Sequence, residues 1–214
     1  GDRYAGPVTR IVAGLVGGRS LAVPPKGTRP TSDKVREAIF SRLEHYEVLD
    51  GARVLDLCAG SGALGLEAAS RGASTVVLVE AGRVAAQVCQ KNVDSLGLSG
   101  VRGVADRAER FVAQPPAQPW DLVLLDPPYD MSDDDVAALL LALEGHVSDD
   151  AVIVVERSSR TPEPTWPASW RLIVTKPYGE TLVHYAEPGA DDDTDLSNAG
   201  SPGDESSADQ RPTD

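Results

Sequence analysis

The chain has 214 residues, 41% of them hydrophobic, and carries a formal net charge of -13, which suits one α/β domain with an appendage. It has no apolar run of membrane-spanning length and no charged start leading into an apolar signal core, so we expect a soluble cytoplasmic protein. Cys58 and Cys89 form no CxxC pair and the three histidines are scattered, which disfavours a disulfide framework and predicts no metal site.

The charge is unevenly placed along the chain. From Glu187 onward, nine acidic residues stand against one arginine, whereas residues 1–43 hold eight basic and three acidic residues. Residues 188–214 contain too few apolar side chains to order themselves, and we expect a disordered acidic tail. The basic front end favours phosphate contact, although scattered arginines on a structural extension would give the same pattern.

Residues 8–46 are predicted to form an extension made of a hairpin and a helix. Apolar and β-branched residues on either side of Gly17-Gly18 indicate a hairpin over residues 8–24. Thr31-Ser32-Asp33 offers capping side chains for a helix. In that helix, Val35, Ile39 and Leu43 fall four apart and face inward. Basic residues of this extension are the candidates for RNA contact: Arg10, Arg19, Lys26, Lys34 and Arg36.

A glycine-rich turn follows the first predicted strand, Arg53 to Cys58. Glycines at 60, 62 and 65 match G-x-G-x-x-G, which provides a tight turn, a close approach to ligand, and close helix–strand packing. The next strand, Thr75 to Glu80, ends in an acid roughly twenty residues further on, where a carboxylate binds ribose hydroxyls. Glu80 therefore predicts a nucleoside-bearing cofactor, unless it only satisfies the dipole of the following helix.

The helix after Glu80 is expected to turn Val84, Val88 and Leu96 towards the sheet and to stop at Gly97. A strand over residues 101–105 then ends at Asp106. This carboxylate could contact an adenine amine or only cap a short helix over residues 107–113.

The segment from Asp121 to Tyr129 is predicted to be the functional centre. Four apolar residues form a buried strand, and Asp126 follows at its carboxyl end, where open α/β sheets bind ligands. Pro127 and Pro128 fix φ and lack N–H donors, so nearby carbonyls can accept hydrogen bonds, and Tyr129 adds an aromatic face. These groups suit a flat base with an exocyclic amine, although an ordinary strand ending in a proline turn would look alike.

The rest of the chain continues an α/β pattern. Ser132 caps a helix through Glu144, and residues 151–156 form another buried strand. Residues 171–176 and 181–187 flank Pro177-Tyr-Gly179 and predict an antiparallel closing hairpin.

Together, Asp56-Leu-Cys-Ala-Gly-Ser-Gly, Glu80 and Asp126-Pro-Pro-Tyr129 resemble class I S-adenosylmethionine-dependent methyltransferases acting on an exocyclic amine. Three further segments, Arg10-Ile-Val-Ala-Gly14, Gly18-Arg19 and Thr28-Arg-Pro-Thr-Ser-Asp-Lys-Val-Arg-Glu-Ala-Ile-Phe40, narrow the resemblance to the RsmD family of guanine-N2 methyltransferases of 16S ribosomal RNA. It covers about residues 8–187. Cys58 stands where the general methyltransferase motif often has glycine.

The resemblance implies a Rossmann-like class I fold over residues 47–187, mostly parallel with an antiparallel closing hairpin. It implies S-adenosyl-L-methionine as cofactor, S-adenosyl-L-homocysteine as product, and 16S ribosomal RNA or the assembling small subunit as partner of a monomer. The implied cofactor residues are Asp56, Ala59, Gly60, Ser61, Gly62, Glu80 and Asp106, with Arg29 and Thr31 closing over the site. The implied catalytic residues are Asp126, Pro127, Pro128 and Tyr129.

Three alternatives stay open from the residues. Asp-Pro-Pro-Tyr can also seat adenine, which would make the protein an N6-adenine methyltransferase of DNA or RNA. An NAD(P)-dependent oxidoreductase shares the glycine turn and Glu80 but leaves Asp-Pro-Pro-Tyr unexplained. A non-catalytic RNA-binding module explains the basic front end but not the cofactor acids.

Overall fold

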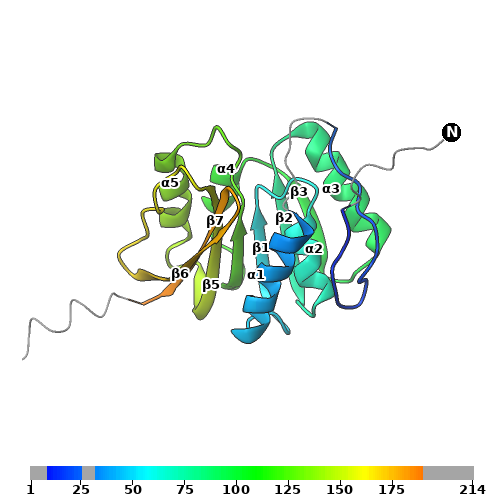
Figure 1. The fold of residues 1–214 in the computed structure, drawn as a ribbon, viewed down its shortest axis with the longest axis horizontal. Coiled ribbons are helices and arrows are strands. Elements are labelled where there is room, and N and C mark those ends of the chain that lie inside the picture. The colour runs from blue at the N-terminus through cyan, green and yellow to red at the C-terminus, as the bar shows by residue number, and fades with distance from the viewer. Residues whose placement is uncertain (1–8, 26–31, 190–214) are drawn as a thin grey trace, which may run out of the picture.

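The computed structural model describes residues 9–25 and 32–189, which form a seven-stranded sheet with helices on both faces (Figure 1). The strands lie in the order β3-β2-β1-β4-β5-β7-β6. Only β7 runs antiparallel, pairing with β5 on one side and β6 on the other. The strands are β1 Arg53–Leu57, β2 Thr75–Glu80, β3 Val101–Ala105, β4 Trp120–Leu125, β5 Val147–Ser158, β6 Trp170–Tyr178 and β7 Thr181–Pro188.

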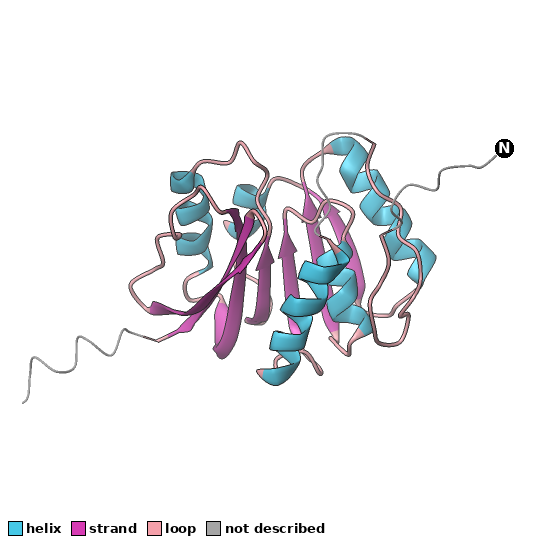
Figure 2. Cartoon of the chain, viewed as in Figure 1, coloured by secondary structure: helices cyan, strands magenta, loops and turns pink. Residues whose placement is uncertain are grey.

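Within the described part of the chain, five helices cover the two faces of the sheet (Figure 2). They are α1 Asp33–His45, α2 Ala63–Ser70, α3 Arg83–Leu96, α4 Ala108–Val112 and α5 Asp133–Leu143. Side chains of α1, α2 and α3 share one hydrophobic core with the sheet, whereas those of α4 and α5 share the other. The predicted class I fold, a mostly parallel sheet with an antiparallel closing hairpin, is therefore confirmed.

Local signals set most helix ends where we expected them. The Ser32 hydroxyl accepts a hydrogen bond from the N–H of Val35 at 3.2 Å, and Ser132 does the same for Asp135 at 3.1 Å. Gly97 ends α3 in the left-handed conformation with φ of 59°, which costs glycine little because it has no Cβ.

The amino-terminal segment forms a hairpin-like arm rather than two regular strands. Its two limbs meet in a single antiparallel bridge between Arg10 and Ser20, with hydrogen bonds from Ile11 to Arg19 and from Leu21 to Thr9. The turn is wider than the predicted Gly17-Gly18 pair, since backbone hydrogen bonds already close it from Gly14 onward. The limbs stay irregular because they pack on α2 and α3 through side-chain bonds instead of forming a ladder.

Two further expectations were wrong. Val84 is 54% exposed, because the inward stripe of α3 runs through Cys89, Asn92, Val93 and Leu96. Strand β5 begins at Val147 rather than Ala151, since Val147 pairs with Trp120 across an irregularity in the register. Polar residues near this start interrupt the apolar pattern, so the sequence did not indicate the first residues of the strand.

Among residues 9–25 and 32–189, no helix is long and apolar enough to cross a membrane.

Candidate active site at the carboxyl edge of the sheet

The carboxyl ends of β2, β1 and β4 bring the glycine-rich turn and two acids to one edge of the sheet. Leu57 pairs with Val79 on one side and with Leu125 on the other. The residues that follow these three, Cys58, Glu80 and Asp126, therefore leave the sheet level with one another. Such an edge is where open α/β sheets bind their ligands.

Asp56 is a buried carboxylate beneath this edge. One oxygen accepts a hydrogen bond from the N–H of Gly65 at 2.9 Å, whereas Oδ1 is buried and has no described partner. The pKa of Asp56 is raised to about 8, chiefly because burial disfavours its charge; the Gly65 N–H lowers it, and nearby Asp126 and Glu80 raise it. A buried oxygen without a partner is costly, so its position favours a ligand that supplies a donor or positive charge.

Glu80 joins two loops of the edge. Its Oε1 accepts the N–H of Gly60 at 2.9 Å, and its Oε2 accepts the N–H of Gly82 at 2.6 Å. Gly82 is the N-cap residue of α3, so the structural role that the sequence left open for Glu80 is present. The bond to Gly60 also fixes the glycine-rich turn. Contact of Glu80 with the ribose of a cofactor stays a prediction.

The three glycines of the turn serve different purposes. Gly60 has φ of 56°, and a Cβ there would meet nothing within 4 Å, so its outer side is open to a ligand. A Cβ on Gly62 would point inward and lie 3.1 Å from the Cys89 sulfur. A Cβ on Gly65 would lie 2.2 Å from Leu78, which confirms the predicted close helix–strand packing.

Cys58 stands at the position where the general methyltransferase motif often has glycine. It adopts φ of 59°, a left-handed conformation that costs a residue with a Cβ roughly 1–2 kcal/mol. Burial, with Glu80 and Asp56 nearby, raises the pKa of its thiol to about 12. The thiol therefore stays protonated and unreactive at neutral pH.

Asp126 begins a loop that a buried arginine braces. The Asp126 side chain is half-buried, and Tyr129 is 77% exposed. The Pro128 carbonyl accepts the N–H of Met131 at 3.0 Å, whereas no described residue donates to the Pro127 carbonyl. Nη2 of Arg157, on β5, donates to the Met131 carbonyl at 3.3 Å and to Asp133 at 2.7 Å. The brace fixes the loop that displays Asp126 and Tyr129.

Asp106 lies at the same edge on the outer strand β3. Its N–H donates to the Glu80 carbonyl at 3.1 Å, and its carboxylate accepts the N–H of Arg107 at 2.8 Å. Arg107 is the N-cap position of α4 and makes no side-chain cap bond. Asp106 therefore stands next to Glu80 without acting as the N-cap of α4.

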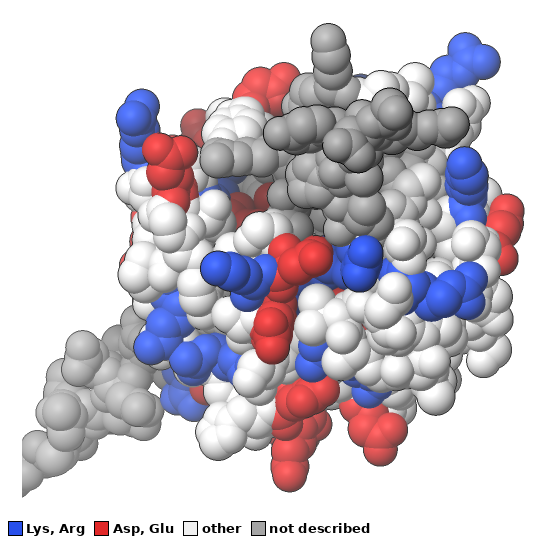
Figure 3. Space-filling model, turned by 45° about the vertical axis from the view of Figure 1, so that its right-hand side comes forward, with Lys and Arg blue, Asp and Glu red and all other residues white. Residues whose placement is uncertain are grey.

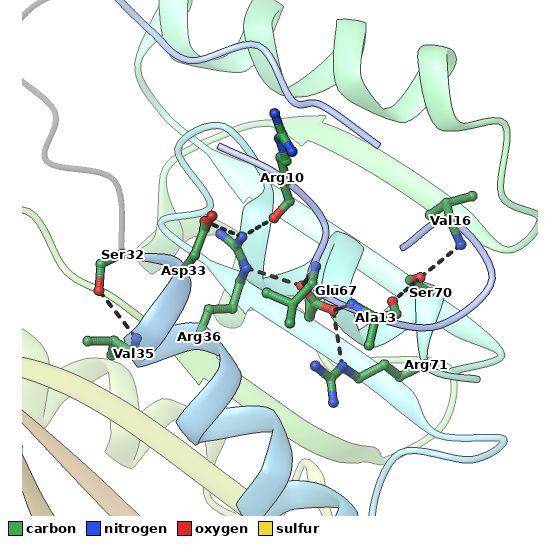
Figure 4. Close-up of polar contacts among 12 residues, drawn as sticks. Arg10, Ala13, Val16, Ser32, Asp33, Val35, Arg36, Glu67, Ser70 and Arg71 are labelled. Carbon is green, nitrogen blue, oxygen red and sulfur yellow. Dashed lines mark hydrogen bonds and ion pairs between the residues drawn. The ribbon is translucent and has the colours of Figure 1, made fainter. Parts of the chain in front are cut away.

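The amino-terminal arm is fastened to the helices that carry the glycine-rich turn. The carboxylate of Glu67, on α2, accepts the N–H groups of Val12 and Ala13 and pairs with Arg36 and Arg71 (Figure 4). Glu67 and the Arg36 guanidinium are fully buried. A side chain at Gly14 would collide with Ser70, since a Cβ there would lie 2.0 Å from the Ser70 carbonyl oxygen. The arm can therefore lie against α2 only with glycine at this position.

Asn92, on α3, joins the other end of the arm to the turn. Its amide accepts the N–H of Ala22 at 2.8 Å and donates to the Ala22 carbonyl at 2.9 Å and the Ser61 carbonyl at 2.8 Å. Asn92 is 2% exposed. One side chain thus holds both the arm and the glycine-rich turn.

Some of the residues predicted to contact RNA are exposed, and one is buried. Arg10, Arg19 and Lys34 are exposed, and basic and acidic side chains alternate on the face shown in Figure 3. Arg36 has no exposed surface, because it pairs with Glu67 and also bonds the Arg10 carbonyl. The prediction that Arg36 contacts RNA was therefore wrong. Lys26, Arg29, Thr31 and the tail from residue 190 lie outside the described residues.

Away from this edge, a groove of about 790 Å³ opens over the face of the sheet that α4 covers. Leu55 and Val77 line its floor, and Arg53 and Arg102 lie at its sides. The groove meets the candidate site only at Asp106.

The family model described as Conserved hypothetical protein 95 matches residues 9–187. Ribosomal RNA small subunit methyltransferase D of Escherichia coli (strain K12) is 38% identical over 187 residues, covering 87% of this chain and 93% of that protein. The protein of the same name from Haemophilus influenzae is 37% identical over 180 residues, covering 82% of this chain and 91% of its own. The chain belongs to the RsmD family of methyltransferases.

Solved structures agree with this RsmD-family assignment. A protein named for methyltransferase activity, yhhF from Escherichia coli, superposes with a TM-score of 0.75 at 37% identity, covering 86% of this chain and 99% of its own. A Pyrococcus horikoshii structure is only 18% identical and carries the fold alone, with a TM-score of 0.63 over 79% of this chain and 94% of its own.

Sequence reasoning missed three residues that organise the site of this RsmD-family chain: Glu67, Asn92 and Arg157. Glu67 and Asn92 each interrupt an apolar helix face, and that interruption was the available signal. Arg157 ends an apolar strand, and nothing in the sequence indicated that it would reach back to Met131.

Proposed function

We propose that the chain transfers a methyl group from S-adenosyl-L-methionine to the exocyclic N2 amine of a specific guanine in 16S ribosomal RNA. The observation that carries the proposal is that Asp126-Pro-Pro-Tyr129 and Glu80 follow the strands on either side of β1, the strand that carries Asp56, at one sheet edge. The names of the relatives from Escherichia coli and Haemophilus influenzae support a ribosomal RNA substrate. The guanine amine is the finer part of the proposal and rests on the Asp-Pro-Pro-Tyr chemistry and the family resemblance.

The acids of the edge fit a cofactor that carries positive charge. The buried Asp56 Oδ1 without a described partner, together with Glu80, would face the ammonium, sulfonium and ribose groups of S-adenosylmethionine. Ala59, Gly60, Ser61 and Gly62 would cradle it, and Asp106 would approach the adenine amine. An NAD(P) pyrophosphate would instead place negative charge among carboxylates, which weighs against the oxidoreductase alternative.

The amine is prepared for reaction by Asp126 and the Pro127 carbonyl. A guanine amine is a poor nucleophile because its lone pair is delocalised into the ring. Two hydrogen bonds from the amine to these acceptors favour a pyramidal nitrogen and direct the lone pair towards the methyl group. The cofactor supplies that methyl group on a sulfonium leaving group. Asp126 then accepts the proton that the methylated nitrogen releases.

Tyr129 and the basic arm hold the RNA. With 77% of its surface exposed, Tyr129 can stack on a base taken out of its helix, which costs a few kcal/mol of unstacking. Exposed Arg10, Arg19 and Lys34 contact phosphates and recognise shape more than sequence. Lys26 belongs to the same proposal, as do Arg29 and Thr31 closing over the cofactor.

The decisive experiment is methyl transfer from radiolabelled S-adenosylmethionine to small-subunit particles, naked ribosomal RNA and duplex DNA, followed by nucleoside analysis. We expect N2-methylguanosine from the ribosomal substrates. N6-methyladenosine would overturn the guanine assignment, and no transfer to any substrate would overturn the proposed activity.

Asp126→Ala and Asp130→Ala form a matched pair for the mechanism. Both remove an aspartate from the same loop, and Asp130 is exposed. We expect Asp126→Ala to lower kcat by about 100-fold or more and Asp130→Ala to leave it within about twofold. Wild-type turnover by Asp126→Ala would remove the proposed role of this carboxylate.

A further inference from the structure

The groove on the α4 face of the sheet combines an apolar floor with basic sides. Leu55 and Val77 form the floor, and both belong to the core shared with α4 and α5. Three arginines line the groove: Arg53 from β1, Arg102 from β3 and Arg110 from α4. Its volume of about 790 Å³ lies within the range of roughly 300–1,000 Å³ that is typical of pockets for small ligands.

The charge of the groove is opposite to that of the whole protein. The chain carries a formal net charge of -13, yet Asp106 is the only acid among the described residues that line the groove. Arg102 is exposed, and the Arg110 side chain is 82% exposed and lies 3.9 Å from Asp106. An ion pair this open to water is weak. The groove therefore presents positive charge that an anionic group can approach.

Flat side chains accompany these charges. The guanidinium carbon of Arg53 lies 5.4 Å from the centre of the ring of Trp120, which is buried. Phe111, on α4, is partly buried and brings a second ring to the groove. Proteins stack unpaired bases on aromatic rings and on guanidinium planes. The groove thus offers flat groups for a base beside arginines for phosphate.

The groove leads away from the active-site edge. Asp106 belongs to the groove and follows β3, whereas Asp126 follows β4, three strands away in the sheet, which corresponds to about 14 Å at 4.8 Å per strand. Arg53 and Arg102 lie at the amino ends of their strands. The amino-terminal arm packs on the opposite face, in the core of α1, α2 and α3. Basic residues therefore flank the active-site edge on both faces of the sheet.

We propose that the groove binds a single-stranded segment of the RNA substrate close to the methylated nucleotide. A base lies against Phe111 and Arg53, and the phosphates contact Arg102 and Arg110. That the occupant is RNA rests on the proposed function, whereas the need for an anion and a flat ring comes from the groove. A duplex keeps its bases stacked inside, so it would offer no ring to the apolar floor.

The acidic tail is a poorer match for the groove. Residues 188–214 supply negative charge, but they contain no aromatic residue, and Leu196 is their only large apolar side chain. Such a segment could pair with the arginines but would leave the apolar floor largely uncovered. An RNA strand carries a flat ring and a phosphate in every nucleotide, so it matches both parts of the groove.

Arg102→Glu tests the phosphate contact, because Arg102 is exposed and lies at the end of β3 away from the active-site edge. Lys91→Glu is the matched control, with the same change of charge at an exposed position of α3, on the opposite face. The probe is a short single-stranded oligouridylate, titrated at several salt concentrations. We expect Arg102→Glu to raise the Kd about tenfold and to reduce the salt slope by about 1, and Lys91→Glu to stay within about twofold. Arg102→Lys keeps the charge and should retain most of the affinity.

Cross-linking locates the bound strand. Oligouridylate that contains 4-thiouridine is irradiated with the full chain, and the cross-linked peptides are mapped by mass spectrometry. We expect cross-links to a peptide that contains Phe111 as well as to the arm, and selective loss of the Phe111 cross-link in Arg102→Glu. Cross-links to the arm alone, or an unchanged Kd in Arg102→Glu, would overturn the inference.

Competition separates the other occupants. Uridine monophosphate that binds as tightly as the oligouridylate would assign the groove to free nucleotides. A peptide of residues 190–214 that removes the Phe111 cross-link, but leaves those to the arm, would assign the groove to the tail. Either result would overturn the inference.

The methyl-transfer assay separates this inference from the proposed function. Arg102→Glu should raise KM for naked ribosomal RNA while kcat and the Kd for S-adenosylmethionine stay within about twofold. Absence of transfer by the wild-type protein would overturn the proposed function, whereas a Phe111 cross-link that depends on Arg102 would still assign RNA to the groove. Thermal unfolding of Arg102→Glu and Lys91→Glu reports whether each variant folds.

Discussion

At the scale of single residues, the site contains the Asp56 carboxylate, whose burial disfavours its charged form. Asp56 is 1% exposed, and its pKa is raised to about 8. Between the unfolded value near 3.8 and the folded value near 8, the folded protein binds more protons at this residue than the unfolded chain does. The stability contributed by Asp56 therefore decreases as pH rises through this window and levels off above it.

We expect Asp56→Asn to remove this pH dependence. Asparagine can still accept the Gly65 N–H but carries no charge to desolvate. Relative to wild type, the variant should gain about 1–3 kcal/mol in free energy of unfolding between pH 5 and pH 8. Urea unfolding at several pH values measures the gain. Asp121→Asn serves as a control, because Asp121 lies near the amino end of β4, away from the active-site edge. A constant difference across the range would contradict the raised pKa.

At the scale of elements, buried polar side chains attach the arm to the methyltransferase sheet. Arg36 and Glu67 form a buried pair between α1 and α2, and removing one partner leaves the other charged and buried. Lys34 lies two residues from Arg36 on α1 but is exposed. The same helix therefore carries one basic residue with a structural role, Arg36, and one that is exposed to solvent and can contact phosphate, Lys34.

Arg36→Ala and Lys34→Ala should separate these two roles. We expect Arg36→Ala to lower the free energy of unfolding by about 3–5 kcal/mol and Lys34→Ala to change it by less than about 0.5 kcal/mol. Lys34→Ala should instead weaken RNA binding and reduce its dependence on salt. Chemical denaturation and salt-titrated RNA binding measure the two effects. Equal stability of the two variants would contradict the buried ion pair.

Asn92 links two functional segments, so its loss should affect both. We expect Asn92→Ala to raise the Kd for S-adenosylmethionine by about tenfold, because the Ser61 carbonyl loses its donor and the glycine-rich turn loosens. The same change should make the arm more sensitive to proteolysis near Ala22. Asp94→Ala, an exposed change on the same helix, should do neither. Normal cofactor affinity in Asn92→Ala would show that the turn does not depend on this link.

At the scale of the whole molecule, charge is divided between a basic arm and an acidic tail. Residues 188–214 contain eight acidic residues and one arginine, and the predicted disordered tail falls mostly outside the described residues. The seven-stranded sheet is complete at Pro188. We therefore expect catalysis not to require the tail and the negative charge of the tail to repel RNA.

Truncation after Glu187 should keep kcat on the ribosomal substrate within about twofold and tighten binding to unrelated RNA several-fold at low salt. Filter binding at two salt concentrations, beside the methyl-transfer assay, measures both effects. A tail whose acids are replaced by Asn and Gln is the matched control and should behave like the truncation. Loss of activity in either variant would contradict this division of charge.

The sequence by itself determined the parts of this protein that depend on neighbours along the chain. The Ser32 and Ser132 caps and the Gly97 stop are local, and each was confirmed. Strand and helix periodicity located most elements but failed for Val84 and for the start of β5. The acids that end β2 and β4 could be placed at one edge because parallel strands share their carboxyl ends. The tertiary structure decided which polar side chains are buried together. Arg36 was wrongly predicted to contact RNA because an arginine on a helix gives no sign of a carboxylate 31 residues away. Asn92 and Ala22 lie 70 residues apart, and only the packing of α3 against the arm brings them into contact.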